Sequence, residues 1–124
     1  MLGKGRDSEF GDGYVVVRPG EHLDHFTTPD FRKALREAAG CGRLIVDLTE
    51  VSFADSEGIG ALAGAVHRSR GSGDQVVVAC RRPSLCRVLS MSRIDAAVPV
   101  VPTLEEAASL IRLGLDGDVD GAVR

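Results

Sequence analysis

Short apolar runs recur along the chain, separated by intervals long enough to hold one helix each. The runs are four or five residues long and rich in β-branched side chains, which favours strands over helices. They lie at residues 14–17, 44–48, 76–79 and 98–101. Pro19 and Gly20 either end the first run or turn it into a short second strand through Leu23. The pattern therefore predicts four to five strands.

Segments with helical spacing of apolar residues fill the intervals. Four helices are predicted, and they start near Thr28, Ser56, Arg82 and Thr103. Thr28 is expected as an N-cap with Pro29 at the first helical position, and Glu106 forms a capping box with Thr103. Alternating strands and helices predict an α/β fold, with a mixed, largely parallel sheet covered by about four helices.

The two ends of the chain differ from this pattern. Residues 1–13 are polar and rich in glycine, so we expect a flexible leader. Residues 14–113 form the predicted domain, and residues 114–124 are expected as a flexible acidic tail. The organisation predicted is one domain with two loose ends.

The composition is that of an acidic domain poor in aromatic residues. The 124 residues carry a formal charge of −3, with four phenylalanines, one tyrosine and no tryptophan. Nucleic-acid binding usually needs a basic face and often aromatic platforms, so no nucleic-acid partner is expected. No apolar stretch reaches the roughly 18–20 residues of a membrane span and the N-terminus has no signal core, which predicts a cytoplasmic protein without a membrane partner.

The cysteines and two of the histidines give no strong metal pattern. Cys41, Cys80 and Cys86 lack paired spacing, so we expect reduced thiols that act as small apolar side chains. A redox-sensing pair is the alternative, and it would need Cα atoms within about 7 Å. His22 and His25 stand three residues apart without an evident third ligand, so a solvated loop is expected. We predict no metal and no cofactor.

Ser56 stands where a strand and a polar turn lead into the second predicted helix. A helix N-terminus exposes N–H groups and positive dipole density, which would tolerate a phosphate on this hydroxyl. Ser56 is therefore either a phosphoacceptor, or Ser56 or Asp55 is simply the N-cap. A catalytic nucleophile is not expected, because the G-x-S-x-G pattern is absent and His67 lies roughly 16 Å away along the same helix.

The segment over residues 44–60 reads Leu-Ile-Val-Asp-Leu-Thr-Glu-Val-Ser-Phe-Ala-Asp-Ser-Glu-Gly-Ile-Gly. It resembles the signature of the STAS domain, specifically of bacterial anti-sigma factor antagonists, in which a strand ending in Asp-Leu precedes Asp-Ser-x-Gly-Leu-Gly. Further similarity lies in residues 20–24 with Thr27, in residues 83–89 and in residues 102–107. The resemblance runs from about residue 14 to residue 113 and implies the STAS fold.

The resemblance implies a binding switch and no enzymatic activity. In this family the unphosphorylated antagonist captures an anti-sigma factor that is itself a serine kinase, and so frees a sigma factor, which is only an indirect partner. Ser56 matches the serine whose phosphorylation releases the antagonist. The phosphate would add about 1.5–2 negative charges beside Asp55 and Glu57. Such a protein is expected to be a monomer or a weak dimer.

The resemblance also implies a partner-binding surface, made of Asp24, Asp55, Ser56, Glu57, Gly58, Ile59 and Gly60. Asp24 would sit near Ser56 and help the kinase recognise it, or it is a turn carboxylate. Asp55 would orient the serine loop, although a helix-start carboxylate needs no other role. Gly58 and Gly60 would let a partner approach the helix closely, and packing of the helix onto the sheet explains them equally well.

Three positions depart from the family pattern. Residues 20–24 are one residue longer than the usual Gly-Glu-Leu-Asp, Glu57 replaces a small side chain, and Arg93 stands where the family usually has glycine. The charge of Glu57 would either impede the kinase or select a particular one, and the loop that holds Arg93 would alter the choice of partner. The alternative function is a STAS scaffold or regulatory module that is never phosphorylated and binds another protein or a small ligand.

Overall fold

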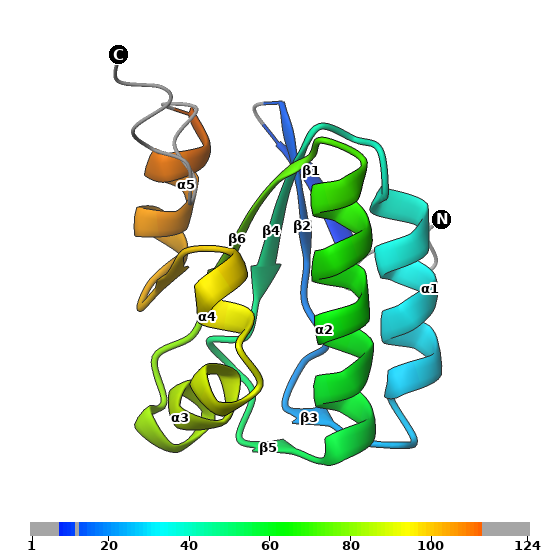
Figure 1. The fold of residues 1–124 in the computed structure, drawn as a ribbon, viewed down its shortest axis with the longest axis vertical. Helices are drawn as coiled ribbons and strands as arrows, with labels where there is room; N and C mark the ends of the chain where they lie inside the picture. Colours follow the sequence, from blue (N-terminus) through cyan, green and yellow to red (C-terminus); the bar gives the residue numbers. More distant parts are fainter. Residues whose placement is uncertain (1–7, 12, 113–124) are drawn as a thin grey trace.

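A five-stranded sheet forms the centre of the computed structural model, which describes residues 8–11 and 13–112 (Figure 1). In sheet order the strands are β1 (Ser8–Gly11), β2 (Tyr14–Val17), β4 (Arg43–Asp47), β6 (Gln75–Ala79) and β7 (Val100–Val101). β1 pairs antiparallel with β2, and the other neighbours pair in parallel. The predicted α/β class with a mixed, largely parallel sheet is confirmed. The acidic tail expected at residues 114–124 lies outside the described residues.

Strand β1 lies inside the segment expected as a flexible leader. It pairs with β2 in the register Ser8↔Val17 to Gly11↔Tyr14. The local sequence carries no strand signal, because this strand is defined by its pairing with β2 and strand formation depends strongly on such context. The expectation of a leader without structure is therefore corrected at residues 8–11, where the chain adds an antiparallel edge strand.

A second, two-stranded sheet is formed by β3 (His22–Leu23) and β5 (Phe53–Ala54), which pair in parallel. β3 is the short second strand that the sequence left open, whereas β5 lies between the predicted polar turn and the second helix, where no strand was expected. The pairing sets Leu23 beside Ala54. The segment before the first helix therefore lies next to the turn that leads into the second helix (Figure 1).

In the described part of the chain, five helices cover the central sheet. They are α1 (Thr28–Ala38), α2 (Ser56–Gly71), α3 (Pro83–Met91), α4 (Ile94–Ala97) and α5 (Leu104–Arg112). α1 and α2 run side by side on the face that α3 and α4 also cover, and α5 covers the other face (Figure 1). Four of these helices were predicted, and the single turn of α4 was not.

Alternate residues of the central strands form two separate apolar clusters. Val15 and Val17 belong to the larger cluster beneath α1 to α4, whereas Val16 and Ile45 belong to the smaller cluster beneath α5. The two-residue period of a strand sends successive side chains to opposite faces. Because helices cover both faces, the central strands are continuous apolar runs, as the sequence pattern indicated.

The helix ends agree with the predicted caps, with one shift. The N–H of Glu106 donates to Oγ1 of Thr103 at 3.0 Å, which confirms the predicted N-cap of α5. The N-cap of α1 is Thr27, so Thr28 is already helical and is completely buried. Among the described helices, none has the length and apolar character needed to cross a membrane.

The turn between α3 and α4 holds Arg93 in the left-handed region, with φ 63° and ψ 20°. Every other described residue with a positive φ is a glycine. A side chain at Cβ makes this conformation unfavourable, and glycine avoids the cost. The backbone therefore explains why glycine is usual at this position in the family that the sequence resembles.

Candidate functional site

Ser56 is the first residue of α2, and its side chain is exposed. The residue before it, Asp55, has an extended backbone and is the N-cap. Among the described residues, the Ser56 hydroxyl has no hydrogen-bond partner. The capping function thus belongs to Asp55, which leaves the hydroxyl of Ser56 at the surface of the helix start.

Asp55 joins two segments that are distant in the sequence. Its Oδ1 accepts a hydrogen bond from the N–H of Gly58 at 3.0 Å, and its Oδ2 accepts one from the N–H of His25 at 3.1 Å. Its own N–H donates to the carbonyl oxygen of Leu23 at 3.0 Å. Both carboxylate oxygens are therefore engaged in fixing the start of α2 against the loop that follows β3.

Gly58 and Ile59 face the interior of this site. A Cβ atom on Gly58 would lie 2.5 Å from both Cγ and the carbonyl oxygen of Leu23, so the helix can approach β3 only because residue 58 lacks a side chain. Ile59 is 7% exposed and packs in the larger core cluster. Gly60, in contrast, is exposed and has open space around its Cα. These contacts support the packing explanation for Gly58.

Asp24 organises the loop next to Ser56. Its Oδ1 accepts hydrogen bonds from the N–H groups of Phe26 and Thr27, at 3.0 and 3.1 Å. Desolvation opposes ionisation, but the hydrogen bonds from Thr27 and Phe26, together with the nearby charge of His22, lower the pKa of Asp24 below its usual value. Asp24 is therefore a turn carboxylate by geometry, and the β3–β5 pairing brings its loop beside the start of α2.

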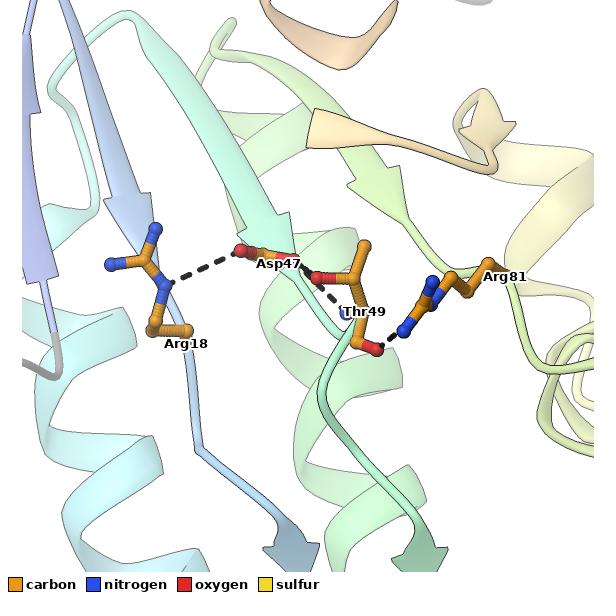
Figure 2. A network of polar contacts seen from close by, with 4 residues as sticks. All are labelled: Arg18, Asp47, Thr49 and Arg81. Atoms are coloured by element: carbon orange, nitrogen blue, oxygen red, sulfur yellow. Dashed lines mark hydrogen bonds and ion pairs between the residues drawn. The ribbon is translucent and has the colours of Figure 1, made fainter. Parts of the chain in front are cut away.

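A polar network anchors the segment that leads from β4 toward Ser56. Figure 2 shows Asp47 between Arg18 and Thr49, with Arg81 reaching the Thr49 backbone. Oδ2 of Asp47 lies 3.3 Å from Nε of Arg18, and Oδ1 accepts hydrogen bonds from the N–H and hydroxyl of Thr49 at 2.9 and 2.7 Å. Nε of Arg81 donates to the Thr49 carbonyl at 3.4 Å. Arg82 adds a similar bond to the Val51 carbonyl at 3.2 Å.

A groove of about 380 Å³ opens beside Ser56. The N-terminal part of α2 contributes Asp55, Ser56 and Gly60 to it, and α3 and the turn after it contribute Val88 and Ser92. A smaller hollow of about 190 Å³ continues from it along β5 and α3, with Ala54 and Val88 common to both. The serine hydroxyl therefore sits at the edge of a groove between two helices.

Large apolar side chains are exposed around the described surface. Phe26 is 79% exposed, Met91 73% and Phe53 53%. Phe53 lies in β5 and lines the smaller hollow, and Met91 is the last residue of α3. Sequence reasoning did not select these side chains. Phe53 pairs in β5 with His22, which is also exposed. The exposure of Phe53 depends on this pairing, which the sequence does not reveal.

The charges at the start of α2 are mainly negative. Asp24, Asp55 and Glu57 cluster there, and Glu57 is exposed in the first turn of the helix. Arg82 is a cation that lines the smaller hollow. In the described part of the chain, no group of three His, Cys, Asp or Glu residues is arranged to hold a metal ion. The site has the features of a binding surface around one hydroxyl.

The family model described as the STAS domain matches residues 6–107. The chain belongs to the STAS domain family. The match spans both β1 and the Asp55-Ser56 turn, and it confirms the family that the motif over residues 44–60 indicated.

Similar proteins of this family are antagonists of anti-sigma factors. The anti-sigma F factor antagonist of Paenibacillus polymyxa is 28% identical over 97 residues, which cover 76% of this chain and 83% of the relative. The crystal structure of an anti-sigma factor antagonist from Mycobacterium paratuberculosis is 27% identical with a TM-score of 0.75, and the match covers 85% of this chain and 91% of that one.

SpoIIAA, a further similar structure, supports the fold alone. Its unphosphorylated form is 23% identical with a TM-score of 0.68, over 85% of this chain and 96% of that one. The phosphorylated form of SpoIIAA from Bacillus is 22% identical with a TM-score of 0.67, over 85% and 97%. The fold is thus common to this chain and to these solved structures.

Proposed function

We propose that this STAS protein is an anti-sigma factor antagonist switched by phosphorylation of Ser56. In its unphosphorylated form it binds an anti-sigma factor that is a serine kinase, and thereby releases a sigma factor in the cytoplasm. It acts by binding and not by catalysis. The relatives from Paenibacillus and Mycobacterium, both antagonists of anti-sigma factors, support this assignment.

The observation that carries the proposal is the division of roles at the start of α2. Asp55 caps the helix, so the exposed hydroxyl of Ser56 is available to a kinase without breaking a hydrogen bond of the fold. A phosphorylated form also has a precedent in the fold, because SpoIIAA is known in an unphosphorylated and a phosphorylated form. Ser56 is therefore the residue on which we place the modification.

Electrostatics explains why one phosphate would release a partner. The group adds about 1.5–2 negative charges to a surface that already holds Asp55 and Glu57. In the free protein, water and the helix dipole accommodate this charge. In a docked complex the same charge would be removed from water, which costs several kcal/mol unless the partner supplies a matching cation.

The groove gives the proposed surface its shape. A partner that places an apolar side chain between α2 and α3 would contact Val88 and pass beside Ser56. The exposed ring of Phe53 borders the continuation of the groove. Apolar contact would then supply much of the affinity, and the hydroxyl of Ser56 would supply the control.

The modification is tested with candidate anti-sigma kinases and Mg-ATP, followed by intact mass measurement. We expect a single phosphate on the wild-type protein and on Ser52→Ala, and none on Ser56→Ala. Ser52 is the matched control because it is also exposed and lies just before β5. A phosphate that persists in Ser56→Ala contradicts the assignment, and binding without any modification favours the unphosphorylated STAS scaffold.

The electrostatic mechanism is tested by capture of the same kinase. Ser56→Asp should weaken binding at least tenfold, or about 1.4 kcal/mol, because a carboxylate carries part of the phosphate charge. Ser109→Asp is the matched control, since it adds the same charge on α5, on the opposite side of the sheet. Equal binding by Ser56→Asp and Ser109→Asp would refute a charge-controlled surface at Ser56.

A further inference from the structure

Two of the three cysteines meet at the carboxyl end of the central sheet, outside the proposed phosphorylation site. Cys80 directly follows β6, and Cys86 lies on α3. Their Sγ atoms are 3.4 Å apart, and both thiols are free. The Sγ of Cys86 also lies 3.5 Å from the carbonyl oxygen of Cys80. The two side chains are thus in direct contact, although the residues are six positions apart.

The backbone on each side of this contact is held by hydrogen bonds. The N–H of Cys80 donates to the carbonyl of Val101 at 2.8 Å, which ties it to β7. The N–H of Cys86 donates to the carbonyl of Arg82 at 2.9 Å, in the first turn of α3. A disulfide needs the sulfur atoms to close from 3.4 Å to about 2.0 Å.

The two thiols differ in access. Cys80 is 2% exposed, whereas Cys86 is only partly buried. Both line a hollow of about 520 Å³ that is open to solvent, together with Arg81 and Asp95. Burial, and the contact with Cys86, raise the pKa of Cys80 to about 12, so Cys80 is protonated at neutral pH and is a poor first nucleophile. An oxidant that enters the hollow would therefore meet Cys86 first.

We propose that Cys80 and Cys86 form a reversible disulfide when the protein meets hydrogen peroxide. The sulfur of Cys86, as thiolate, attacks one peroxide oxygen; the O–O bond breaks, hydroxide leaves, and a sulfenic acid forms while the hydroxide takes up a proton to become water. The sulfur of Cys80 then attacks the sulfenic sulfur, the S–O bond breaks, and the departing hydroxide takes the thiol proton of Cys80. Two thiols are oxidised, one peroxide is reduced, and two waters are released.

The position of this pair matters for the rest of the molecule. The loop that the disulfide would close contains Arg81 and Arg82, which donate hydrogen bonds to the backbone of Thr49 and Val51. The same helix, α3, gives Val88 to the groove beside Ser56. Oxidation would therefore tie α3, which forms one wall of that groove, covalently to the end of β6.

The test uses the full chain with Cys41→Ser, which removes the exposed third thiol and leaves both proposed partners in place. After peroxide treatment and tryptic digestion, the peptides over residues 71–81 and 82–87 should remain joined, because trypsin cleaves after Arg81 but not before Pro83. Dithiothreitol should separate them and restore both thiols. Two free thiols after peroxide treatment, or Cys86 oxidised while Cys80 still reacts with an alkylating agent after unfolding, would overturn the proposal.

The order of reaction is tested with single substitutions in the same Cys41→Ser background. Cys80→Ser should accumulate a sulfenic acid at Cys86 that dimedone traps. Cys86→Ser, which keeps only Cys80, should lose its thiol to peroxide at least tenfold more slowly than Cys80→Ser loses its own. The reason is that Cys80 is buried and protonated. Equal rates for the two variants would contradict Cys86 as the first thiol attacked.

Discussion

Gly58→Ala is expected to destabilise the protein, although alanine is the better helix former. Gly58 lies in the first turns of α2, where alanine normally gains about 1 kcal/mol over glycine. Here the new Cβ would lie 2.5 Å from both Cγ and the carbonyl oxygen of Leu23, and 3.1 Å from its carbonyl carbon. Two of these atoms belong to the backbone, so the clash cannot be relieved by a side-chain rotation alone.

The magnitude follows from what would have to move. Leu23 is completely buried, pairs with Ala54 in the small sheet, and accepts the N–H of Asp55 at 3.0 Å. Overpacking a core contact costs about 1–3 kcal/mol, and a weakened backbone hydrogen bond adds about 1 kcal/mol. After subtraction of the helix gain, we expect a net loss of about 2 kcal/mol, which lowers the Tm by about 10 °C.

The assay is urea unfolding followed by circular dichroism, with Gly60→Ala as the matched control. Gly60 lies two residues along the same helix, and a Cβ atom added there would have no neighbour within 4 Å. Its replacement should therefore raise the free energy of unfolding by about 0.5–1 kcal/mol. Opposite signs for the two variants are the expected result. If Gly58→Ala matches the wild type within about 0.5 kcal/mol, the close approach of α2 to β3 does not determine this glycine.

Three further predictions concern the fold. Arg93→Gly should raise the free energy of unfolding by up to about 1 kcal/mol, because glycine adopts the left-handed conformation of residue 93 without strain. Arg87→Gly, inside α3, is the control and should lower the free energy of unfolding by about 1 kcal/mol. Urea unfolding of both variants measures the two changes. Asp74→Ala should lose about 2 kcal/mol in the same assay, since this buried carboxylate accepts two backbone N–H groups at 2.9 Å, and an unchanged midpoint would contradict that role. The lowered pKa of Asp24 means that its carboxylate stabilises the fold above its ordinary pKa of 3.8 and loses this contribution as the pH falls below that value. Between about pH 5 and 3, the Tm of Asp24→Asn should therefore fall less with decreasing pH than the Tm of the wild type, as measured by thermal unfolding.

The sequence was sufficient for the elements whose signal is local. The apolar runs at residues 44–48 and 76–79 became β4 and β6 within one residue. Both strands are buried on both faces, and their polar residues Arg43, Asp47 and Gln75 stand at the strand ends. The start of α2 was predicted near Ser56 from the helical spacing of the apolar residues that follow it, and α2 begins at Ser56. Local chemistry and tertiary structure agree at these positions.

The elements that sequence reasoning missed depend on contacts between distant segments. β1 and β5 are strands only by virtue of their partners, β2 and β3, and neither has an apolar alternation of its own. α4 is a single turn that follows the left-handed residue Arg93, and the sequence pattern predicts a loop at this position. The groove beside Ser56 needs α3 to lie next to α2, which no spacing within either helix reveals.

The residues predicted for the partner-binding surface form two groups: some contact other parts of the fold, and the others are exposed to solvent. Asp24, Asp55, Gly58 and Ile59 all have partners within the fold, so changing them would perturb the site and the stability of the domain together. Ser56, Glu57 and Gly60 are exposed in the first turns of α2. In the proposed switch, a charge added at Ser56 therefore changes what a partner meets without removing a contact that holds the domain. A signal read by a partner at a rigid surface requires this separation, and Asp55 provides it by capping the helix in place of the serine.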